Sequence, residues 1–595
     1  MQISAQDTLN LVFRQLGRED VLIANENTTQ QVASGSRSLK DIKDVPFTIY
    51  VVSKEEIQKY GFVTLADVLK SMPGIMVAQP SSGSLGEAFL MRGLLGNVYA
   101  KILINDLPVK PSAVEGMPIG AQLPIQQAER IEVTFGPTIG IYGGDAAAGV
   151  INIITTQTER PFYVQADVGL GSQGYSNLSV LLAGKVGRDK EVVKFSIFGS
   201  YTDFEDRRVV YDKDNLYNPS NYISDSSTFF RLNNYRGTIE NPAFKDLPHQ
   251  SKLIGAQLNY KAFRFYFEQL ERQDHSAIGL NPVTVSYANP STYTGESITR
   301  LNAGFVQERE KWVFRLDATG ILYQLDPGSS TLLVQNNLYN GVRSLIDSST
   351  SNFDTLRIRE NEATIYQQLL SNQRFSYAAS NDVWIEPLLT MAATNWLEFS
   401  LGGSFQFSNN QPFINYLPVP FESDNIQNQR EQQLGFQNIA YQPDKEQFNN
   451  IAFYFQQYLN FDKFDVLGAV RYDYHSKYQG IWSGHLAGNY KLGETLSARV
   501  SYGTAFQVPN TFWEASSLGL TFLGDSLTVE SAYSFGHPAL EYLRNRSFEV
   551  GLRWGSKDNF ETDIVYFRSN TQNLIAQRQY LSSESPVVLI DAYEN

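Results

Sequence analysis

Hydrophobic and polar residues alternate at every second position through most of the chain after about Pro161. The clearest alternating runs are segments 192–202, 263–270, 451–461 and 548–554. In the last run, Phe548 and Val550 lie on the face opposite Glu549 and Arg553. This period predicts β-strands. Strands with so polar a second face cannot stack in a dry sandwich, but they can line a wet lumen while their apolar face meets lipid.

The connections between these predicted strands alternate in length. Short connections are expected at 187–190 and 462–463, and long ones at roughly 204–249, 327–360, 409–446 and 511–544. Short turns at one end and long loops at the other are typical of outer-membrane barrels. No run of about eighteen apolar residues occurs, so the sequence predicts no transmembrane helix.

The first 160 residues show a different texture, with helix signals between short β runs. Ser53 followed by Glu56 is a capping box, and Thr64 with Asp67 repeats it before an apolar helix face. Pro73-Gly74 ends that helix. Two further β runs, 130–135 and 149–155, flank a segment rich in glycine and alanine. We therefore expect a small α+β unit ahead of the strand-rich region.

An ordered set of motifs in this unit resembles the plug domain of TonB-dependent outer-membrane receptors. The stretches are DVLKSMPGI at 67–75, KILINDLP at 101–108, AERIEV at 128–133 and AGVINII at 148–154. The residues that match the family pattern are Arg92, Gly93, Glu129, Arg130, Glu132, Gly136, Pro137, Tyr142, Gly143, Gly149 and Asn152. Asn105-Asp106 replaces the family's Asp-Gly, and both residues suit a tight turn.

The strand-rich region also resembles this family, through 501–509, 536–540 and 548–552. Gln507 stands where the family has a charged residue, and the Lys-Pro-Glu portion of the family's motif is missing from this chain. The resemblance implies a transmembrane antiparallel β-barrel of the 22-stranded type with an N-terminal α+β plug inside the lumen. We expect an N-terminal arm at 1–43, the plug at 44–160 and the barrel at 161–595.

The barrel region contains fewer strand candidates than the family's barrels. We count roughly fifteen or sixteen, and 590–595 looks like an interior strand of the family. An open edge in lipid leaves unpaired backbone groups costing several kcal/mol each. Our hypothesis is that about six strands are absent from this chain, because they are cleaved, lie on a second chain or lie beyond this sequence.

The polar arm contains a candidate contact segment for the energy-transducing protein TonB, by resemblance to the family. It comprises Thr29, Gln30, Gln31, Val32, Ala33 and Ser34. Strand addition would give affinity through backbone hydrogen bonds with loose sequence demands. Segment 7–12 is a second candidate, and an ordinary linker is the alternative for both.

The resemblance places two plug segments at the apex, where they would touch a ligand. The candidates are Ser81, Ser82, Ser84 and Leu85 in segment 79–86, and Val109 and Lys110 in segment 109–112. Plain turns are the alternative interpretation.

Composition narrows the remaining functions. A net charge of −14 argues against a nucleic-acid partner held by phosphate contacts. The absence of cysteine excludes disulfides and Cys-ligated zinc or iron–sulfur sites. The first residues show no secretory signal, which an outer-membrane protein needs, so we expect that a signal was removed.

Candidate chemistry is sparse. The Gly-rich segment lacks the G-K-[ST] ending of a P-loop. The five histidines are scattered, and a haem-ligand role stays open for His249, His275 and His537. Segment 212–215 could contribute oxygens to a Ca²⁺ site, or be a solvated loop. We find no catalytic arrangement and expect no enzyme, no metal site and no cofactor.

The implied function is active import of a scarce ligand across the bacterial outer membrane, driven by proton-motive force through TonB. Siderophore–iron, haem, cobalamin and similar ligands share this architecture, and loops decide among them. The alternative function is a structural or scaffolding subunit of a larger outer-membrane assembly. A passive channel is disfavoured by the plug motifs.

Overall fold

The computed structural model describes most of the chain outside several long loops and the N-terminal arm. The described residues are 31–32, 40–41, 45–78, 87–119, 123–136, 142–156, 161–172, 174–188, 191–204, 249–275, 284–286, 293–335, 373–417, 420–422, 445–493, 495–515, 517–518, 521–523, 528–530, 532–535, 540–556, 560–581 and 589–595. No helix among them is long and apolar enough to cross a membrane.

Residues 45–156 form the plug, an α+β unit built on a five-stranded sheet. In spatial order the strands are β3 (Ile49–Ser53), β9 (Ala128–Phe135), β10 (Gly149–Thr155), β7 (Ala100–Ile104) and β8 (Leu107–Pro108). A second sheet comprises β4 (Ile75–Ala78), β5 (Ala88–Met91) and β6 (Leu94–Leu95). The helices are α2 (Lys54–Tyr60), α3 (Leu65–Lys70) and α4 (Gly96–Tyr99).

Helices α2 and α3 of the plug begin at the capping residues that the sequence predicted. Both capping boxes are present, with Ser53 and Thr64 as N-caps of α2 and α3. The turn between β7 and β8 holds Asn105 and Asp106 at φ 54° and 67°. Two consecutive positive φ values are those of a type I′ hairpin turn, which Asn and Asp tolerate. The substitution of Asp-Gly by Asn-Asp therefore leaves a tight turn in place.

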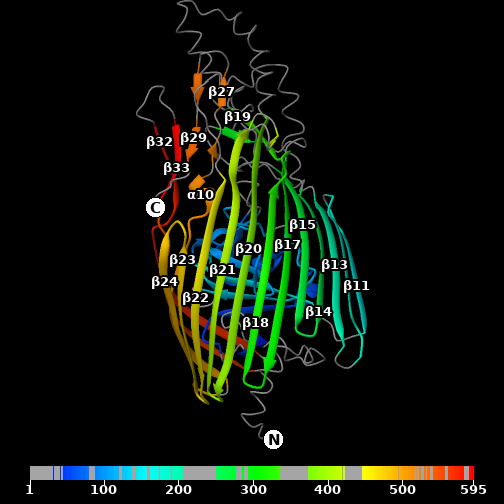
Figure 1. The fold of residues 1–595 in the computed structure, drawn as a ribbon, viewed down its shortest axis with the longest axis vertical. Coiled ribbons are helices and arrows are strands. Elements are labelled where there is room, and N and C mark those ends of the chain that lie inside the picture. The colour runs from blue at the N-terminus through cyan, green and yellow to red at the C-terminus, as the bar shows by residue number, and fades with distance from the viewer. Residues whose placement is uncertain are drawn as a thin grey trace, which may run out of the picture.

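Among the described residues, fifteen long strands form a curved antiparallel wall around the plug (Figure 1). The strands are β11 (Phe162–Leu170), β12 (Ser176–Val186), β13 (Val193–Phe204), β14 (His249–Tyr260), β15 (Phe263–His275), β17 (Tyr293–Arg309), β18 (Trp312–Leu325), β20 (Gln373–Thr394), β21 (Leu397–Leu417), β22 (Glu446–Asn460), β23 (Phe464–His475), β24 (Gln479–Lys491), β25 (Leu496–Gln507), β30 (Leu543–Ser556) and β31 (Phe560–Gln572). Each long strand pairs with the next long strand along the chain, and short strands lie between some of them in sequence.

The wall has the two faces that the alternation predicted. Large apolar side chains that point away from the plug are exposed, among them Phe265, Leu301, Phe453, Trp482 and Ile564. Polar and charged side chains on the inner face are buried, among them Gln257, Glu268, Arg300, Asp317 and Arg499. This is the apolar-out, polar-in pattern of a transmembrane barrel around a polar filling. The predicted fold class is confirmed.

The short strands and one short helix lie on the side of the long connections (Figure 1). They are β16 (Thr284–Ser286), β19 (Ser330–Gln335), β26 (Ser517–Leu518), β27 (Thr521–Leu523), β28 (Thr528–Glu530), β29 (Ala532–Phe535), β32 (Ala576–Leu581), β33 (Leu589–Glu594) and α10 (Thr511–Ala515). Segment 590–595, which resembles an interior strand of the family, lies largely in β33, and β33 pairs with β32 and β29.

Two predicted loop boundaries differ from the structure. β21 continues to Leu417, so the loop predicted from 409 starts later, and β20 starts at Gln373. The sequence loses its alternation there because strands that rise past the lipid need no apolar face, while backbone pairing continues.

The wall has two edges among the described strands. β11 is in register only with β12, and β31 is in register only with β30. No pairing between β11 and β31 occurs within the described ranges. The hypothesis that further strands complete the ring stays a prediction.

Candidate functional site

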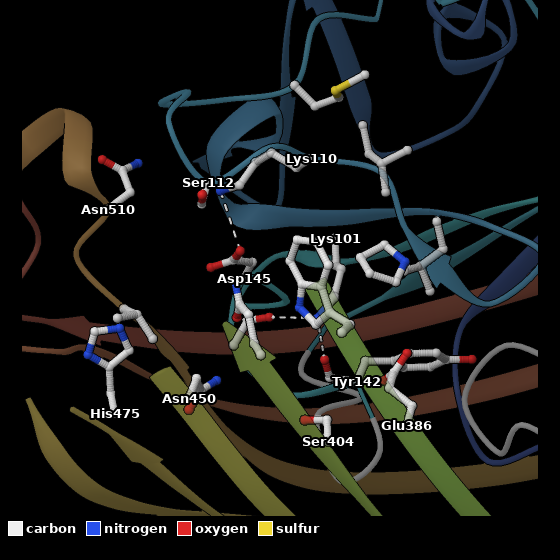
Figure 2. Close-up of a pocket in the computed structure, with 18 of the residues that line it drawn as sticks. Lys101, Lys110, Ser112, Tyr142, Asp145, Glu386, Ser404, Asn450, His475 and Asn510 are labelled. Atoms are coloured by element: carbon white, nitrogen blue, oxygen red, sulfur yellow. Dashed lines mark hydrogen bonds and ion pairs between the residues drawn. The ribbon is translucent and has the colours of Figure 1, made fainter. Parts of the chain in front are cut away.

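A cavity of about 110 Å³ lies between the plug and the wall strands β20 to β23 (Figure 2). Plug residues form one side and barrel residues the other. The polar lining residues include Lys101, Lys110, Ser112, Asp145, Glu386, Ser404, Gln406, Asn450, Arg471, His475 and Asn510. Three basic side chains and two carboxylates thus meet in one place, beside Tyr142, Trp384 and Phe448.

The plug side of the cavity is fixed by Lys101 at the start of β7. Its ammonium donates to the backbone oxygens of Tyr142 at 2.5 Å and Gly144 at 3.4 Å. Segment 142–144 is therefore held against β7, and the Lys101 charge lies beside the cavity (Figure 2).

A buried arginine forms the wall side. Arg471 on β23 donates to both carboxylate oxygens of Asp473, at 2.7 and 2.8 Å, and to Ser404 at 3.2 Å. Such a two-pronged contact fixes the guanidinium plane. Gly143 faces this group with φ +73°, and a Cβ there would lie 2.6 Å from Arg471 Nη2. Only glycine permits so close an approach of the plug backbone.

Two polar wall residues on adjacent strands complete this side. Asn450 and His475 are paired in register on β22 and β23. His475 Nδ1 accepts the backbone N–H of Lys477 at 3.2 Å. Asn450 Oδ1 is buried and accepts no hydrogen bond from a described residue. This amide oxygen is an acceptor that a bound molecule can use.

Lys110 and Asp145 join two plug segments at the cavity (Figure 2). Lys110 Nζ lies 3.4 Å from Asp145 Oδ2, and Gln507 of the barrel also donates to Asp145. A molecule that enters the cavity and interacts with either charge therefore acts on a link between plug and barrel.

The apical plug segment 110–117 is held from two sides by the barrel. Ser112 donates its backbone N–H to Asp382 Oδ2 at 3.0 Å and its hydroxyl to Asn410 Oδ1 at 2.7 Å. Thr511 at the start of α10 donates to the Ser112 carbonyl at 3.0 Å. The Trp513 indole donates to Glu115 Oε1 at 3.0 Å. α10 thus straps this segment from the long-loop side.

Burial shifts the ionisation of two plug groups under α10. The pKa of Glu115 is raised by burial, against smaller lowering effects of the Trp513 hydrogen bond and Lys110. The pKa of Tyr99 is raised to about 12 by burial and by Glu115. Because the Glu115 carboxyl resists ionisation, its contact with Trp513 of α10 is sensitive to the charge of this carboxyl.

A second set of contacts anchors the plug to β25, β30 and β31. Arg92 is ion-paired with Glu549, and both side chains are buried. Thr48 donates to Glu549 at 2.5 Å and accepts from Arg499 at 3.0 Å. Arg499 in turn contacts both oxygens of Asp563, at 2.8 and 2.9 Å. The anchor is therefore a network and not one pair.

The β7–β8 turn makes a third anchor. Asn152, fully buried, donates to Asp106 Oδ1 at 2.8 Å and accepts the Asp106 backbone N–H at 3.1 Å. Arg315 on β18 then reaches Asp106 Oδ2 at 3.2 Å. The family-motif residue Asn152 thus shapes a turn that touches the wall.

The structure separates the residues singled out from the sequence into several places. Lys110 and Tyr142 line the cavity, Gly143 borders it, and Val109 is buried in the plug core. Arg92 anchors the plug to the barrel. Gln31 and Val32 form β1, which pairs with β2 (Lys40–Asp41).

The remaining motif residues serve the plug itself. Glu129 lies 3.9 Å from Lys54, and Arg130 contacts the fully buried Glu132 at 2.7 Å. Gly93, Gly136 and Gly149 have positive φ. Outside the described residues lie Thr29, Gln30, Ala33, Ser34, Ser81, Ser82, Ser84, Leu85, Pro137, His537 and segments 7–12 and 212–215. His249 is buried with Nδ1 2.6 Å from Asp274, and His275 ends β15.

Sequence reasoning missed the wall partners of the plug. The sequence analysis did not single out Asp382, Arg471, Arg499 or Asp563, and it named Glu549 only as a polar-face residue of an alternating run. All occupy inward positions of alternating strands, so their parity marked them as lumen-facing. Which of them meets which plug residue depends on strand register, which parity does not give.

The comparisons with known proteins agree with this geometry. Residues 41–150 match the TonB-dependent Receptor Plug Domain, and residues 275–586, just over half of the chain, match the TonB dependent receptor-like beta-barrel. The chain belongs to the TonB-dependent receptor family. This is a family of outer-membrane receptors and transporters rather than enzymes.

Individual relatives extend the comparison. Over 168 residues the chain is 33% identical to the vitamin B12 transporter BtuB of Photobacterium profundum, a match over 28% of this chain and about a quarter (27%) of that protein. A mutant of the ferric enterobactin receptor PfeA from Pseudomonas aeruginosa superposes with TM-score 0.63 at 16% identity, over 92% of this chain and 75% of that one. The ferric yersiniabactin uptake receptor FyuA from Yersinia pestis gives 0.59 at 12%, over 94% and 75%. The two solved structures support the fold.

Proposed function

We propose that this receptor actively imports a scarce small molecule across the outer membrane, and that the cavity above Lys101 is part of its ligand path. The observation that carries the proposal is the convergence of Lys110, Asp145 and Arg471 where the plug apex meets the wall. A ligand bound there contacts both parts at once. It is therefore placed to change how firmly the plug is held.

We further propose that energy enters through the N-terminal arm, with residues 29–34 pairing with a TonB-type protein. Gln31 and Val32 adopt an extended conformation, which strand addition requires. In this proposal residues 1–43 are the arm, 44–160 the plug and 161–595 the barrel. Pulling on the arm would remodel the plug and let the ligand pass.

The proposed ligand class is a siderophore–iron complex, haem, cobalamin or a similar chelate. The matched relative is named a vitamin B12 transporter, and the solved neighbours are named a ferric enterobactin receptor and a ferric yersiniabactin uptake receptor. Loops decide among such ligands within one architecture. The apical candidates Ser81, Ser82, Ser84, Leu85, Val109 and Lys110 belong to this proposal.

The test is uptake of radiolabelled ferric siderophores, haem and cobalamin by cells that carry the receptor. Replacing Val32 by proline removes a backbone N–H needed for strand pairing, so we expect bound ligand but no energy-dependent uptake. Val32→Thr, which keeps the backbone donor, is the matched control. Uptake by the proline variant at the control rate would remove the arm from the mechanism.

One observation favours a second function, a structural subunit of a larger assembly. Among the described strands, β11 has a register partner only in β12 and β31 only in β30. A second chain that supplies strands would satisfy the backbone groups on their other sides. Copurification of such a chain, with no ligand bound or taken up in the same assay, would favour this function over import.

A further inference from the structure

The outward face of β30 and β31 carries three exposed arginines at the end near the long loops. They are Arg544 and Arg546 on β30 and Arg568 on β31. Toward the short turn, the outward residues of β30 are instead apolar and 40–53% exposed: Phe548, Val550, Leu552 and Trp554. The arginines therefore stand where the apolar band of these strands ends.

Strand pairing brings the three side chains onto one patch, which we call the arginine face. Arg546 is opposite Asn570, and Arg568 is opposite Phe548, so Arg546 and Arg568 are diagonal neighbours on one side of the sheet. Diagonal partners lie about 7–8 Å apart, within reach of long side chains. Arg544 lies on the same face of β30, two residues before Arg546 in the chain.

Within the part of the chain that the structure describes, no carboxylate pairs with the arginine face. The outward positions 544–554 of β30 and 562–572 of β31 carry no Asp or Glu. None of the three arginines forms an ion pair with a residue that the structure describes. Lys252, an exposed outward residue on β14, differs because Glu271 stands directly opposite it.

An unbalanced cluster at this height points to an anionic group of the membrane. Basic residues cost little at the bilayer interface. Guanidinium groups bind phosphate through paired hydrogen bonds. Directly below, Phe548, Tyr502 and Tyr566 form an exposed aromatic row across three strands, which can hold acyl chains.

We propose that the arginine face binds the net negatively charged phosphate headgroup of a lipid in the outer leaflet, with the lipid's chains lying on the aromatic row. This site lies on the outside of the barrel, remote from the cavity. It is therefore independent of the imported ligand and of the proposed function.

The test is native mass spectrometry of the full chain, purified in detergent and titrated with phosphatidylglycerol or phosphatidylcholine. We expect the receptor to retain phosphatidylglycerol preferentially. Each arginine near an anionic surface contributes about fivefold in affinity, so the triple variant Arg544→Gln, Arg546→Gln, Arg568→Gln should lose about a hundredfold. Lys252→Gln is the matched control, since it removes an exposed basic residue from the same surface, and it should keep the preference.

Folding of each variant is checked by the heat-dependent shift in gel mobility of the barrel, and Arg546→Gln alone serves if the triple variant does not fold. Equal phosphatidylglycerol retention by the folded variant and the original receptor would overturn the proposal. So would an equal loss in Lys252→Gln, which would indicate a general charge effect. Displacement of the lipid by inorganic phosphate at low millimolar concentration would show a site for free phosphate and overturn the lipid assignment.

Discussion

At the residue scale, Gly143 decides how closely the plug approaches the wall. Its φ of +73° is strained for any residue with a side chain, and a Cβ there would collide with the Arg471 guanidinium. Gly61 has a similar φ of +67°, but no atom lies within 4 Å of its missing Cβ. Comparing substitutions at Gly143 and Gly61 therefore distinguishes the cost of backbone strain from the cost of the steric clash.

We predict that Gly143→Ala destabilises the plug more than Gly61→Ala does. Both substitutions incur the left-handed cost of about 1–2 kcal/mol, and Gly143→Ala adds an overpacking cost of about 1–3 kcal/mol. Urea titration with hydrogen exchange of the plug as readout measures both. Equal losses would mean that Arg471 moves aside freely.

Glu115 gives a prediction about pH. Its folded pKa is raised above the ordinary value of 4.5, mainly by burial. The folded state therefore holds this proton more tightly, so its stabilising contribution is full below about pH 4.5 and is lost as pH rises through the raised pKa. Glu115→Gln keeps an oxygen acceptor for Trp513 and removes the charge.

We expect Glu115→Gln to make local stability of the apical segment greater than in the original receptor at neutral pH, and less dependent on pH. Hydrogen exchange of residues 110–117 across pH 4 to 8 measures this. Glu55→Gln, an exposed residue on α2, should leave the profile unchanged. A variant that exchanges faster at neutral pH would show that the carboxylate is the required form.

At the element scale, α10 joins the long loop to the plug. It lies between β25 and the short strands, and its first turn contacts Ser112 and Glu115. Trp513 is buried, and its ring lies 6.3 Å from that of Tyr99. A short helix has little stability of its own, so these plug contacts hold it.

We predict that Trp513→Phe loosens the apical segment. An aromatic ring is kept while the indole N–H is lost, which leaves a partly buried Glu115 oxygen without its donor at a cost of about 1–3 kcal/mol. Faster hydrogen exchange in 110–117, with the wall strands unchanged, is the expected result. Trp482→Phe, on the lipid face and 69% exposed, is the control and should have no such effect.

The elements themselves were largely readable from the pattern. Alternation located wall strands such as β15, β22 and β30, because lipid and lumen impose opposite demands on successive side chains. It failed at the far end of β21, where the residues NNQPFINYL do not alternate between polar and apolar. The short strand β26 and the helix α10 were missed because they depend on contacts with β21 and the plug.

At the scale of the whole molecule, buried charges join two units that each have their own hydrogen-bonded sheets. The Arg92–Glu549 pair lies in a network with Thr48, Arg499 and Asp563. Removing one partner leaves the other buried and uncompensated, which typically costs about 3–5 kcal/mol. The plug should therefore be sensitive to single changes and less so to paired ones.

We predict that Arg92→Gln weakens retention of the plug by roughly 3–5 kcal/mol while the barrel remains folded. Protease sensitivity of the plug in urea, compared with gel mobility of the barrel, measures the two separately. The exposed pair Lys261–Glu191 provides the control, since Lys261→Gln should leave both readouts unchanged.

The double variant Arg92→Gln, Glu549→Gln distinguishes a direct pair from independent effects. Residues in one ion-pair network couple by about 0.5–3 kcal/mol, so the double variant should lose less than the sum of the singles. Strict additivity would contradict a direct interaction and would assign the anchor to Arg499 instead.

The sequence by itself determined which side chains face lipid and which face the lumen, because a period of two is a local property of each strand. It also determined the plug's caps and turns and the family, because these depend on residues close together in the chain. Only the tertiary structure decided that Arg471 meets Gly143, that α10 covers Glu115, and that Arg546 and Arg568 share one patch. Those contacts join residues far apart in sequence or on neighbouring strands, so they depend on strand register and on the position of the plug in the lumen.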